Sequence, residues 1–216
     1  MKNALLIACL FTFGHLTLLA QTQAYPRMLH TRPKSAVRVP AQEVPAGLKK
    51  IYSSLGPRNN PYNGNDGWGI SGPNSIAQRS SFVAVPFTPK SNAHVSQVNV
   101  PLAYNGSGAN QVNINIYGDS NGVPGALLVG PITAFNLPDF GTCCTLVGAA
   151  FQSLAVTGGT QYWVVANTPL SGTGSDFFGI WDIGVKDLPL AFEDNSMWFA
   201  VNGYNLPAVE VLGTIP

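Results

Sequence analysis

Charge is scarce in this sequence of 216 residues. Only 10% of the residues are Asp, Glu, Lys or Arg, whereas an average soluble domain has about 25%. Long surface helices need more charged residues than this to keep their outer faces in water. The formal net charge of +1 also lacks the basic excess that attracts nucleic acid or an anionic membrane. We therefore expect a domain without long helices and no nucleic-acid partner.

Histidine and cysteine are rare as well, with three residues of each. Zinc and copper sites and Ser-His-Asp catalysis depend on these side chains. The G-x-S-x-G motif of serine hydrolases is absent from the sequence. A cysteine enzyme built from Cys143 or Cys144 with His94 would need electropositive surroundings, and nothing near these residues supplies them. We find no catalytic residues in the sequence and expect a protein that is not an enzyme.

The first 24 residues have the organisation of a secretory signal peptide. Lys2 precedes an apolar run over residues 4–20, and small residues follow at Ala20, Thr22 and Ala24. We expect cleavage after Ala24, with Ala20 as the alternative position. No second apolar span follows, so we expect a secreted, periplasmic or extracellular protein with no transmembrane segment after cleavage.

The remaining chain divides by charge and composition into an arm, residues 25–56, and a domain, residues 57–216. The arm has six basic residues and one acid, and the domain has four basic residues and nine acids. Pro33, Pro40 and Pro45 interrupt helix formation in the arm. We interpret the arm as a mostly irregular linker, with a turn or two of helix expected over residues 46–54.

The domain has the pattern of an all-β protein. Residues 112–117 alternate strictly between apolar and polar side chains, which indicates a half-buried antiparallel strand. Turn residues are abundant, with 23 Gly and 17 Pro, and they separate the apolar segments. We expect an antiparallel two-sheet sandwich, jelly-roll-like in topology. Its strands are expected at residues 81–87, 98–102, 112–117, 126–132, 161–166, 177–183, 197–202 and 208–212.

Two short motifs give the domain a family resemblance. Tyr117-Gly118-Asp119 is followed by Gly122-Val123-Pro124-Gly125, and the segment from Leu154 to Gly158 is followed by Tyr162-Trp163-Val164-Val165. Together with Phe87-Thr88-Pro89, these segments resemble secreted bacterial β-sandwich domains of the choice-of-anchor type. The resemblance covers about residues 51–166 and implies a fold and an extracytoplasmic setting, but no activity. Many family members have a C-terminal sorting signal, and we expect none in this protein. Together with the export signal, the resemblance favours a bacterial source.

Cys143 and Cys144 are neighbours, and Cys9 would leave with the signal peptide. A disulfide between adjacent residues closes a very small ring, so the usual rules for disulfide frameworks do not apply. Three states stay open for this pair. They are two free thiols, a vicinal disulfide, and an intermolecular or metal-linked pair.

Two loops rich in oxygen ligands are candidates for calcium. In the first, residues 59–67, the candidate ligands are Asn63, Asn65 and Asp66. The second is the segment 119–122, where a hairpin turn explains Asp119, Asn121 and Gly122 without an ion. Neither loop has the twelve-residue pattern of an EF-hand. Calcium is therefore a hypothesis, and we expect no other cofactor.

Aromatic residues are the remaining candidates for a binding site. Trp68, Tyr62 and Trp181 could stack on sugar rings, although each could equally belong to the core. We interpret the protein as an exported, non-enzymatic binding module for extracellular polysaccharide or an envelope component. The alternative is a structural cell-surface or matrix module with no small ligand. A glycan-active enzyme is the third option and would need two facing carboxylates, for which the candidates are Asp176, Asp182, Glu193 and Asp194.

Overall fold

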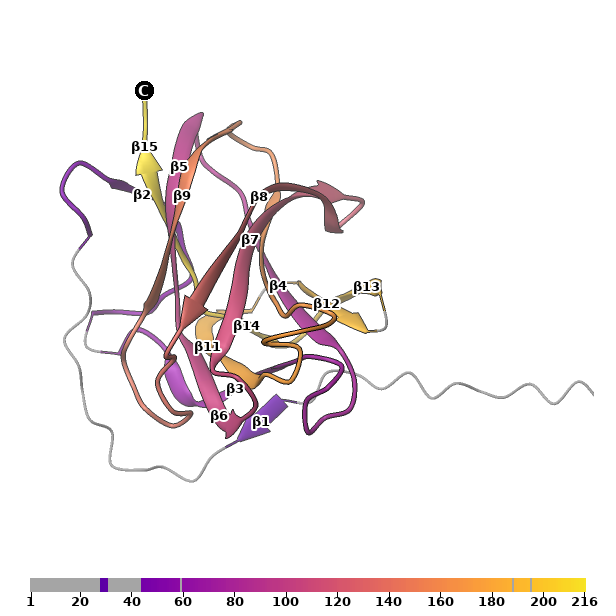
Figure 1. The fold of residues 1–216 in the computed structure, drawn as a ribbon. Coiled ribbons are helices and arrows are strands. Elements are labelled where there is room, and N and C mark those ends of the chain that lie inside the picture. Colours follow the sequence, from indigo (N-terminus) through magenta and orange to yellow (C-terminus); the bar gives the residue numbers. More distant parts are fainter. Residues whose placement is uncertain (1–27, 31–43, 59, 188, 195) are drawn as a thin grey trace, which may run out of the picture.

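The computed structural model describes residues 28–30, 44–58, 60–187, 189–194 and 196–216. Every regular element within these residues is a β-strand, and the strands form two antiparallel sheets that pack as a sandwich (Figure 1). The all-β fold class predicted from alternation and turn residues is confirmed. The expected signal peptide, residues 1–24, and much of the expected arm lie outside the described residues.

The larger sheet has the strand order β14-β11-β3-β4-β10-β7-β8. Shorter strands pair with its members: β1 with β3, β6 with β11, β12 with β4, and β13 with β12. The bounds are β1 Met28–His30, β3 Asn63–Ser71, β4 Ser81–Phe87, β6 Leu102–Ser107, β7 Gln111–Ser120, β8 Val123–Phe135, β10 Tyr162–Asn167, β11 Phe178–Asp187, β12 Leu190–Asp194, β13 Met197–Val201 and β14 Asn205–Pro207.

The smaller sheet has four strands in the order β2-β15-β5-β9. Its C-terminal strand β15 lies between β2 and β5, so strands from both ends of the described chain meet in it. The bounds are β2 Lys49–Ser53, β5 Ala93–Val100, β9 Val147–Val156 and β15 Glu210–Thr214.

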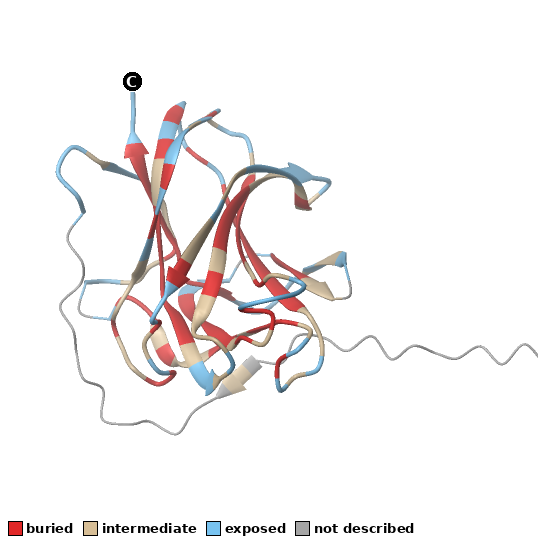
Figure 2. Cartoon of the chain, viewed as in Figure 1, coloured by how far each residue is buried: buried red, intermediate tan, exposed pale blue. Residues whose placement is uncertain are grey.

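The core lies between the two sheets and is built from alternate residues of the strands. Figure 2 shows buried residues along the central strands of both sheets and exposed residues in the hairpins and at the ends. Each large apolar side chain in this core stabilises the fold by about 1.5–3 kcal/mol relative to exposure. Val85, Ile114 and Val164 of the larger sheet and Val95 and Val211 of the smaller one have no exposed surface.

Pro101 separates two strands where the sequence predicted one. The expected strand 98–102 is divided into the end of β5 and the start of β6. Proline has no backbone N–H to donate to a ladder, so a strand pairing ends there. The chain then crosses from the smaller sheet to the larger, where β6 pairs with β11.

The arm is more ordered than the sequence predicted. The helix expected over 46–54 is absent, and β2 pairs with β15 instead. Farther upstream, β1 pairs with β3. Lys49 and Lys50 of β2 are exposed. Because backbone pairing does not need apolar side chains, this strand could not be recognised from its basic composition. The sandwich therefore begins before Pro57.

The Asn- and Gly-rich segment expected to be a loop contains the start of β3. Gly67 explains how such a segment enters the sheet, because a Cβ at this position would lie 2.3 Å from Cγ2 of Ile180. Only glycine permits this close approach of β3 to β11. Low strand propensity in the sequence was outweighed by tertiary pairing.

Within the residues that the structure describes, no helix has the length and apolar character needed to cross a membrane.

Candidate functional site

The three aromatic residues predicted to bind a ligand are buried in the sandwich. The side chains of Tyr62, Trp68 and Trp181 are 2%, 2% and 0% exposed, respectively. Trp68 and Trp181 are paired across the β3–β11 ladder. Their indole N–H groups donate to the backbone carbonyls of Asn205 and Ala208. No ring face of the three is open to a glycan in this conformation, so a binding surface has to be sought elsewhere.

Cys143 and Cys144 form a disulfide in the loop between β8 and β9. Cys144 is buried and packs with Tyr62 and Ala208, and Cys143 is partly buried beside them. Sγ of Cys143 lies 4.0 Å from the carbonyl oxygen of Tyr62. Of the three states left open by the sequence, the structure contains the vicinal disulfide. With both sulfurs bonded, neither cysteine has a thiolate for nucleophilic attack.

The predicted calcium ligands Asn63, Asn65 and Asp66 form a compact turn at the start of β3. Oδ1 of Asn63 accepts a hydrogen bond from the backbone N–H of Asn65 over 3.0 Å. Nδ2 of Asn63 donates to Oδ2 of Asp66 over 2.5 Å. A Cβ on Gly64, within this turn, would lie 3.3 Å from Cβ of Cys143. The turn and the disulfide loop are therefore in contact.

Strand β11 adds a second carboxyl group, Asp182, to this region. Asp182 is the ladder partner of Gly67, the residue after Asp66. Its side chain is 1% exposed, and its Oδ1 atom has no hydrogen-bond partner. Burial and, secondarily, the charge of Asp66 raise the pKa of the Asp182 carboxyl well above its usual range. The sequence alone allowed Asp182 to be named only as a candidate catalytic acid, because the pairing of β3 with β11 is not visible in it.

Tyr62 completes the surroundings of this carboxyl pair. Its hydroxyl donates to the Thr145 carbonyl over 3.0 Å, close to the disulfide. Burial and the charge of Asp182 raise the pKa of the Tyr62 phenol, while the contact with Thr145 lowers it to a smaller degree. In the described part of the chain, no group of three or more His, Cys, Asp or Glu side chains is placed to hold a metal ion. A cation here would need amide or carbonyl oxygens in addition to the two carboxylates.

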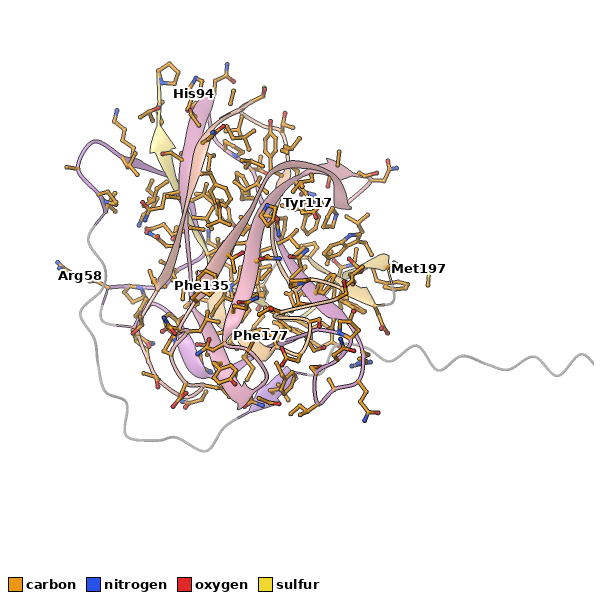
Figure 3. The ribbon with its side chains drawn as sticks, in the orientation of Figure 1. Arg58, His94, Tyr117, Phe135, Phe177 and Met197 are labelled. Atoms are coloured by element: carbon orange, nitrogen blue, oxygen red, sulfur yellow. A yellow bond between two sulfur atoms is a disulfide. The ribbon has the colours of Figure 1, made fainter. Side chains whose placement is uncertain are left out.

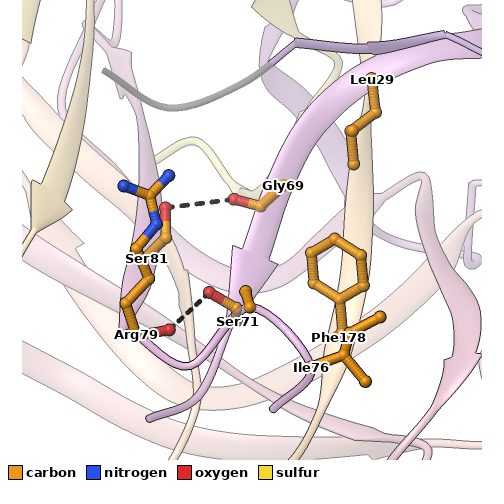
Figure 4. A pocket seen from close by; sticks show the side chains of 8 residues that line it. Leu29, Gly69, Ser71, Ile76, Arg79, Ser81 and Phe178 are labelled. Carbon is orange, nitrogen blue, oxygen red and sulfur yellow. Dashed lines mark hydrogen bonds between the residues drawn. The ribbon is translucent and has the colours of Figure 1, made fainter. Parts of the chain in front are cut away.

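A hollow of about 380 Å³ lies along β3 and the segment that leads into β4; we call it the β3–β4 hollow. Figure 4 shows Leu29, Phe178 and Ile76 along one side of it, with Arg79 and Ser81 along the other. Ile76 is 65% exposed, so an apolar side chain stands at the rim in water. The full lining is Leu29, Gly69, Ser71, Ile76, Ala77, Arg79, Ser81 and Phe178.

The polar groups of the β3–β4 hollow are both donors and acceptors. The Ser71 hydroxyl donates to the Arg79 carbonyl over 2.8 Å, and the Ser81 hydroxyl donates to the Gly69 carbonyl over 3.4 Å. Each hydroxyl oxygen keeps acceptor capacity after donating its proton. The Arg79 guanidinium lies 3.9 Å from the Asp194 carboxylate and carries five N–H donors in all. The hollow thus combines an apolar wall with a mixed polar wall.

A second hollow, of about 340 Å³, lies between β4, β10 and the β7–β8 hairpin. It includes Gln161 and Trp163, whose side-chain N–H groups both donate to Oδ1 of Asp119. The other Asp119 oxygen accepts the backbone N–H of Gly122. Since protein donors already occupy the Asp119 oxygens, the hairpin needs no calcium ion.

The four carboxylates considered for glycoside hydrolysis lie in different surroundings. Asp176 accepts a hydrogen bond from the Ala109 backbone N–H, and Asp194 forms an ion pair with Arg79. Asp182 is buried on β11, whereas Glu193 is half-buried on β12 next to Asp194. Burial raises the pKa of Glu193, and a backbone contact with Ser196 lowers it to a smaller degree.

His94 stands apart from the cysteines. Figure 3 labels it at the start of β5, where it is paired with Thr214 of β15 and its Nδ1 lies 3.3 Å from the Ser153 hydroxyl. Met197 projects from the β12–β13 hairpin and Phe135 lies on β8 in the same view. These two apolar side chains are exposed on the surface, and neither of them lines one of the two hollows.

Comparison with models of protein families, with curated proteins and with solved structures finds no match to this chain.

Proposed function

We propose that the protein is an exported, non-catalytic binding module that holds a polysaccharide chain in the β3–β4 hollow. The observation that carries this proposal is the placement of the Arg79 guanidinium opposite the apolar side chains of Phe178 and Ile76 in an open depression. Sugar rings have apolar C–H faces and polar edges. Such rings need an apolar wall and a polar wall within one depression.

The hydrogen-bonding groups of the hollow suit sugar hydroxyls. Neighbouring hydroxyls on a sugar act as donors and acceptors together. Ser81, which is 7% exposed, keeps acceptor capacity after donating its proton to the Gly69 carbonyl, whereas Ser71 is 1% exposed and serves to shape the wall of the hollow. The charge of Arg79 is paired with Asp194, and its guanidinium N–H donors suit hydroxyl as well as carboxylate oxygens, so a sugar acid is a candidate ligand beside a neutral sugar.

The extracytoplasmic setting is supported by two features that are independent of the hollow. The first 24 residues have the composition of a signal peptide. The disulfide between Cys143 and Cys144 fits an oxidising compartment. The proposed location is therefore the periplasm or the extracellular space.

We also propose kinship with choice-of-anchor domains. In support, the two motifs behind this resemblance are in contact, since Trp163 of the second motif donates to Asp119 of the first. If other members of the family have the same contact, it would hold their β7–β8 hairpin in the same position against β10. It carries no implication for activity.

A structural role is the second candidate function, and a surface feature favours it. Strand β8 is the terminal strand of the larger sheet, and Leu127, Leu128 and Phe135 on it are exposed. An exposed edge strand with apolar side chains can pair with another chain. A module that assembles through β8 would need no glycan.

Affinity electrophoresis in gels that contain neutral or acidic polysaccharides tests the two roles. We expect retardation of the wild-type protein by a uronic-acid polysaccharide, and a loss of retardation in Phe178→Ala and Arg79→Gln. Phe135→Ala is the matched control, because it removes an exposed aromatic ring from β8 outside the hollow. If no polysaccharide retards the folded protein, glycan binding is refuted. Self-association that Phe135→Ala abolishes would then support the structural role.

A further inference from the structure

The smaller sheet brings an amine, a carboxylate and an amide into contact across three neighbouring strands. Lys50 of β2 and Asn99 of β5 lie on either side of Glu210, which belongs to the strand between them, β15. Nζ of Lys50 lies 3.0 Å from Oε1 of Glu210, and Nδ2 of Asn99 donates to Oε2 of Glu210 over 3.2 Å. Both distances are within the reach of about 2.6–3.2 Å at which a carboxylate acts as a general base or acid.

Gln97 adds a fourth group, which contacts the amide oxygen. Its Nε2 donates to Oδ1 of Asn99 over 2.7 Å. Because the carboxylate only accepts and this Gln97 nitrogen only donates, the Asn99 amide has its nitrogen toward Glu210 and its oxygen toward Gln97. A Cβ on Gly148 of β9 would lie 3.3 Å from this oxygen. The carbonyl is therefore polarised at the atom where negative charge develops when a nucleophile attacks its carbon.

The amide and the carboxylate are shielded from water, whereas the amine is not. Asn99 lies between the core residues Val98 and Val100, so its side chain points away from the core, yet it is only 2% exposed. The side chain of Glu210 is 7% exposed and that of Lys50 is 55% exposed. Ammonia formed here would have a path to solvent along Lys50. Groups held in contact in this way react with effective molarities of about 10⁵–10⁸ M when their orientation is favourable.

We propose that Lys50 and Asn99 form an intramolecular isopeptide bond, with Glu210 as the catalytic residue. Glu210 takes a proton from the Lys50 ammonium, and the neutral Nζ attacks Cγ of Asn99. The new Nζ–Cγ bond replaces the Cγ–Nδ2 bond. Nζ loses two protons in all, and Nδ2 leaves with both of them as an ammonium ion. Glu210 carries these protons and ends as a carboxylate, so the reaction needs no oxidant, reductant or cofactor.

The bond would tie β2 to β5 across β15. A covalent link between residues 50 and 99 reduces the freedom of the unfolded chain and stabilises the sandwich in the manner of a disulfide. It would fix the strand that the basic arm contributes to the domain. The bond is independent of glycan binding, because none of its three residues lines the β3–β4 hollow.

Mass spectrometry of the denatured, purified protein tests the bond. After correction for the disulfide, we expect a mass lower than the sequence mass by one ammonia molecule. Protease digestion should release a branched peptide that joins Lys50 to Asn99. Lys50→Arg, which keeps a positive charge beside Glu210, and Glu210→Gln should both lack the branched peptide and have the full mass. The matched control is Lys49→Arg, which changes the exposed neighbour of Lys50 and should form the bond as the wild type does.

The Lys50→Arg variant also separates this reaction from another loss of ammonia. Asn-Gly sequences such as Asn121-Gly122 lose ammonia when they form a succinimide, which does not depend on Lys50. A full mass in the folded wild type, or an ammonia loss that persists in Lys50→Arg, overturns the proposal and leaves a non-covalent network. If Glu210→Gln does not fold, the exposed Lys50→Arg position decides the question. Lys50→Arg should also unfold at a lower temperature than Lys49→Arg, because arginine keeps the ion pair but stays protonated and forms no bond.

Discussion

The indole N–H of Trp163 donates a hydrogen bond to Oδ1 of Asp119 over 2.7 Å. Trp163 is 1% exposed on β10, whereas Asp119 is exposed near the end of β7. The same Asp119 oxygen accepts from the Gln161 side chain over 2.7 Å. This contact ties the β7–β8 hairpin to the neighbouring strand and gives the buried indole its polar partner.

Replacing Asp119 with Ala should destabilise the fold by about 1–2 kcal/mol. The change leaves the Trp163 N–H without its partner, and an unpaired buried donor costs about 1–3 kcal/mol. The exposure of Asp119 places the expected value in the lower part of that range. Urea unfolding measures it, with Asp187→Ala on exposed β11 surface as the control. Equal stability of the two variants would contradict a structural role for the Asp119–Trp163 contact.

Acid should weaken the same contact. Burial raises the pKa of Asp119, but hydrogen bonds from Trp163, Gln161 and Gly122 together outweigh it, so the net pKa is lowered. A lowered pKa means that the contribution is complete above the unfolded-state pKa of about 3.9 and is lost as the pH falls through the folded-state value. Urea unfolding followed from about pH 5 down through the unfolded-state pKa of about 3.9 and below the folded-state pKa should show a smaller acid loss in Asp119→Asn. Parallel pH profiles would refute this assignment.

Gly67→Ala should destabilise the protein by about 1–3 kcal/mol or more. Its Cβ would lie 2.3 Å from Cγ2 of Ile180 and 2.7 Å from the Trp181 carbonyl oxygen. The control is Gly118→Ala on β7, where the nearest atom would be 3.9 Å away. Thermal unfolding compares the pair. A tolerated alanine at Gly67 would contradict the close approach of β3 and β11.

Reduction of the Cys143–Cys144 disulfide should lower the free energy of unfolding by only about 1 kcal/mol. In the chain-entropy model, a disulfide stabilises less as the loop it closes becomes shorter, and these residues are adjacent. Urea unfolding with and without a phosphine reductant measures the change, and mass spectrometry verifies reduction. Complete unfolding on reduction would show that packing around Tyr62 depends on the disulfide far more than this model allows.

A fragment of residues 57–216 should be less stable than one of residues 44–216. The shorter fragment lacks β2, which pairs with β15 and contributes Ile51 and Tyr52 to the core. Its loss would leave β15 as an exposed edge strand. Circular dichroism during thermal unfolding and the solubility of both fragments measure the effect. Identical unfolding curves for the two fragments would contradict this prediction and place the start of the stable domain at Pro57.

The sequence predicts strands well where alternation is strong. The strict pattern in β7 and the apolar run in β4 are visible without a structure, and β4 has the predicted bounds, Ser81–Phe87. Strands β3 and β9 were missed because glycine, asparagine and alanine dominate parts of them and have low strand propensity. Their pairing depends on neighbours that are distant in sequence.

The candidate sites were only partly accessible to the same reasoning. Asn63 and Asp66 could be named from their spacing, because an Asx turn is a local structure. Asp182 could not be connected with them, since their proximity arises from the pairing of β3 with β11. The β3–β4 hollow could not be predicted from the sequence either, because Leu29 becomes part of its lining only through the pairing of β1 with β3.

The pairing of β2 with β15 sets the response of the module to mechanical load. Lys49 at the beginning of β2 is opposite Gly213, near the end of β15, and Ser53 is opposite Glu210. A pulling force between Lys49 and the C-terminus would therefore act at one end of this ladder. The hydrogen bonds of an antiparallel pair are perpendicular to its strands, so they would break in succession from Gly213 toward Glu210 instead of sharing the force. A module pulled between Lys49 and its C-terminus would therefore open first between β2 and β15.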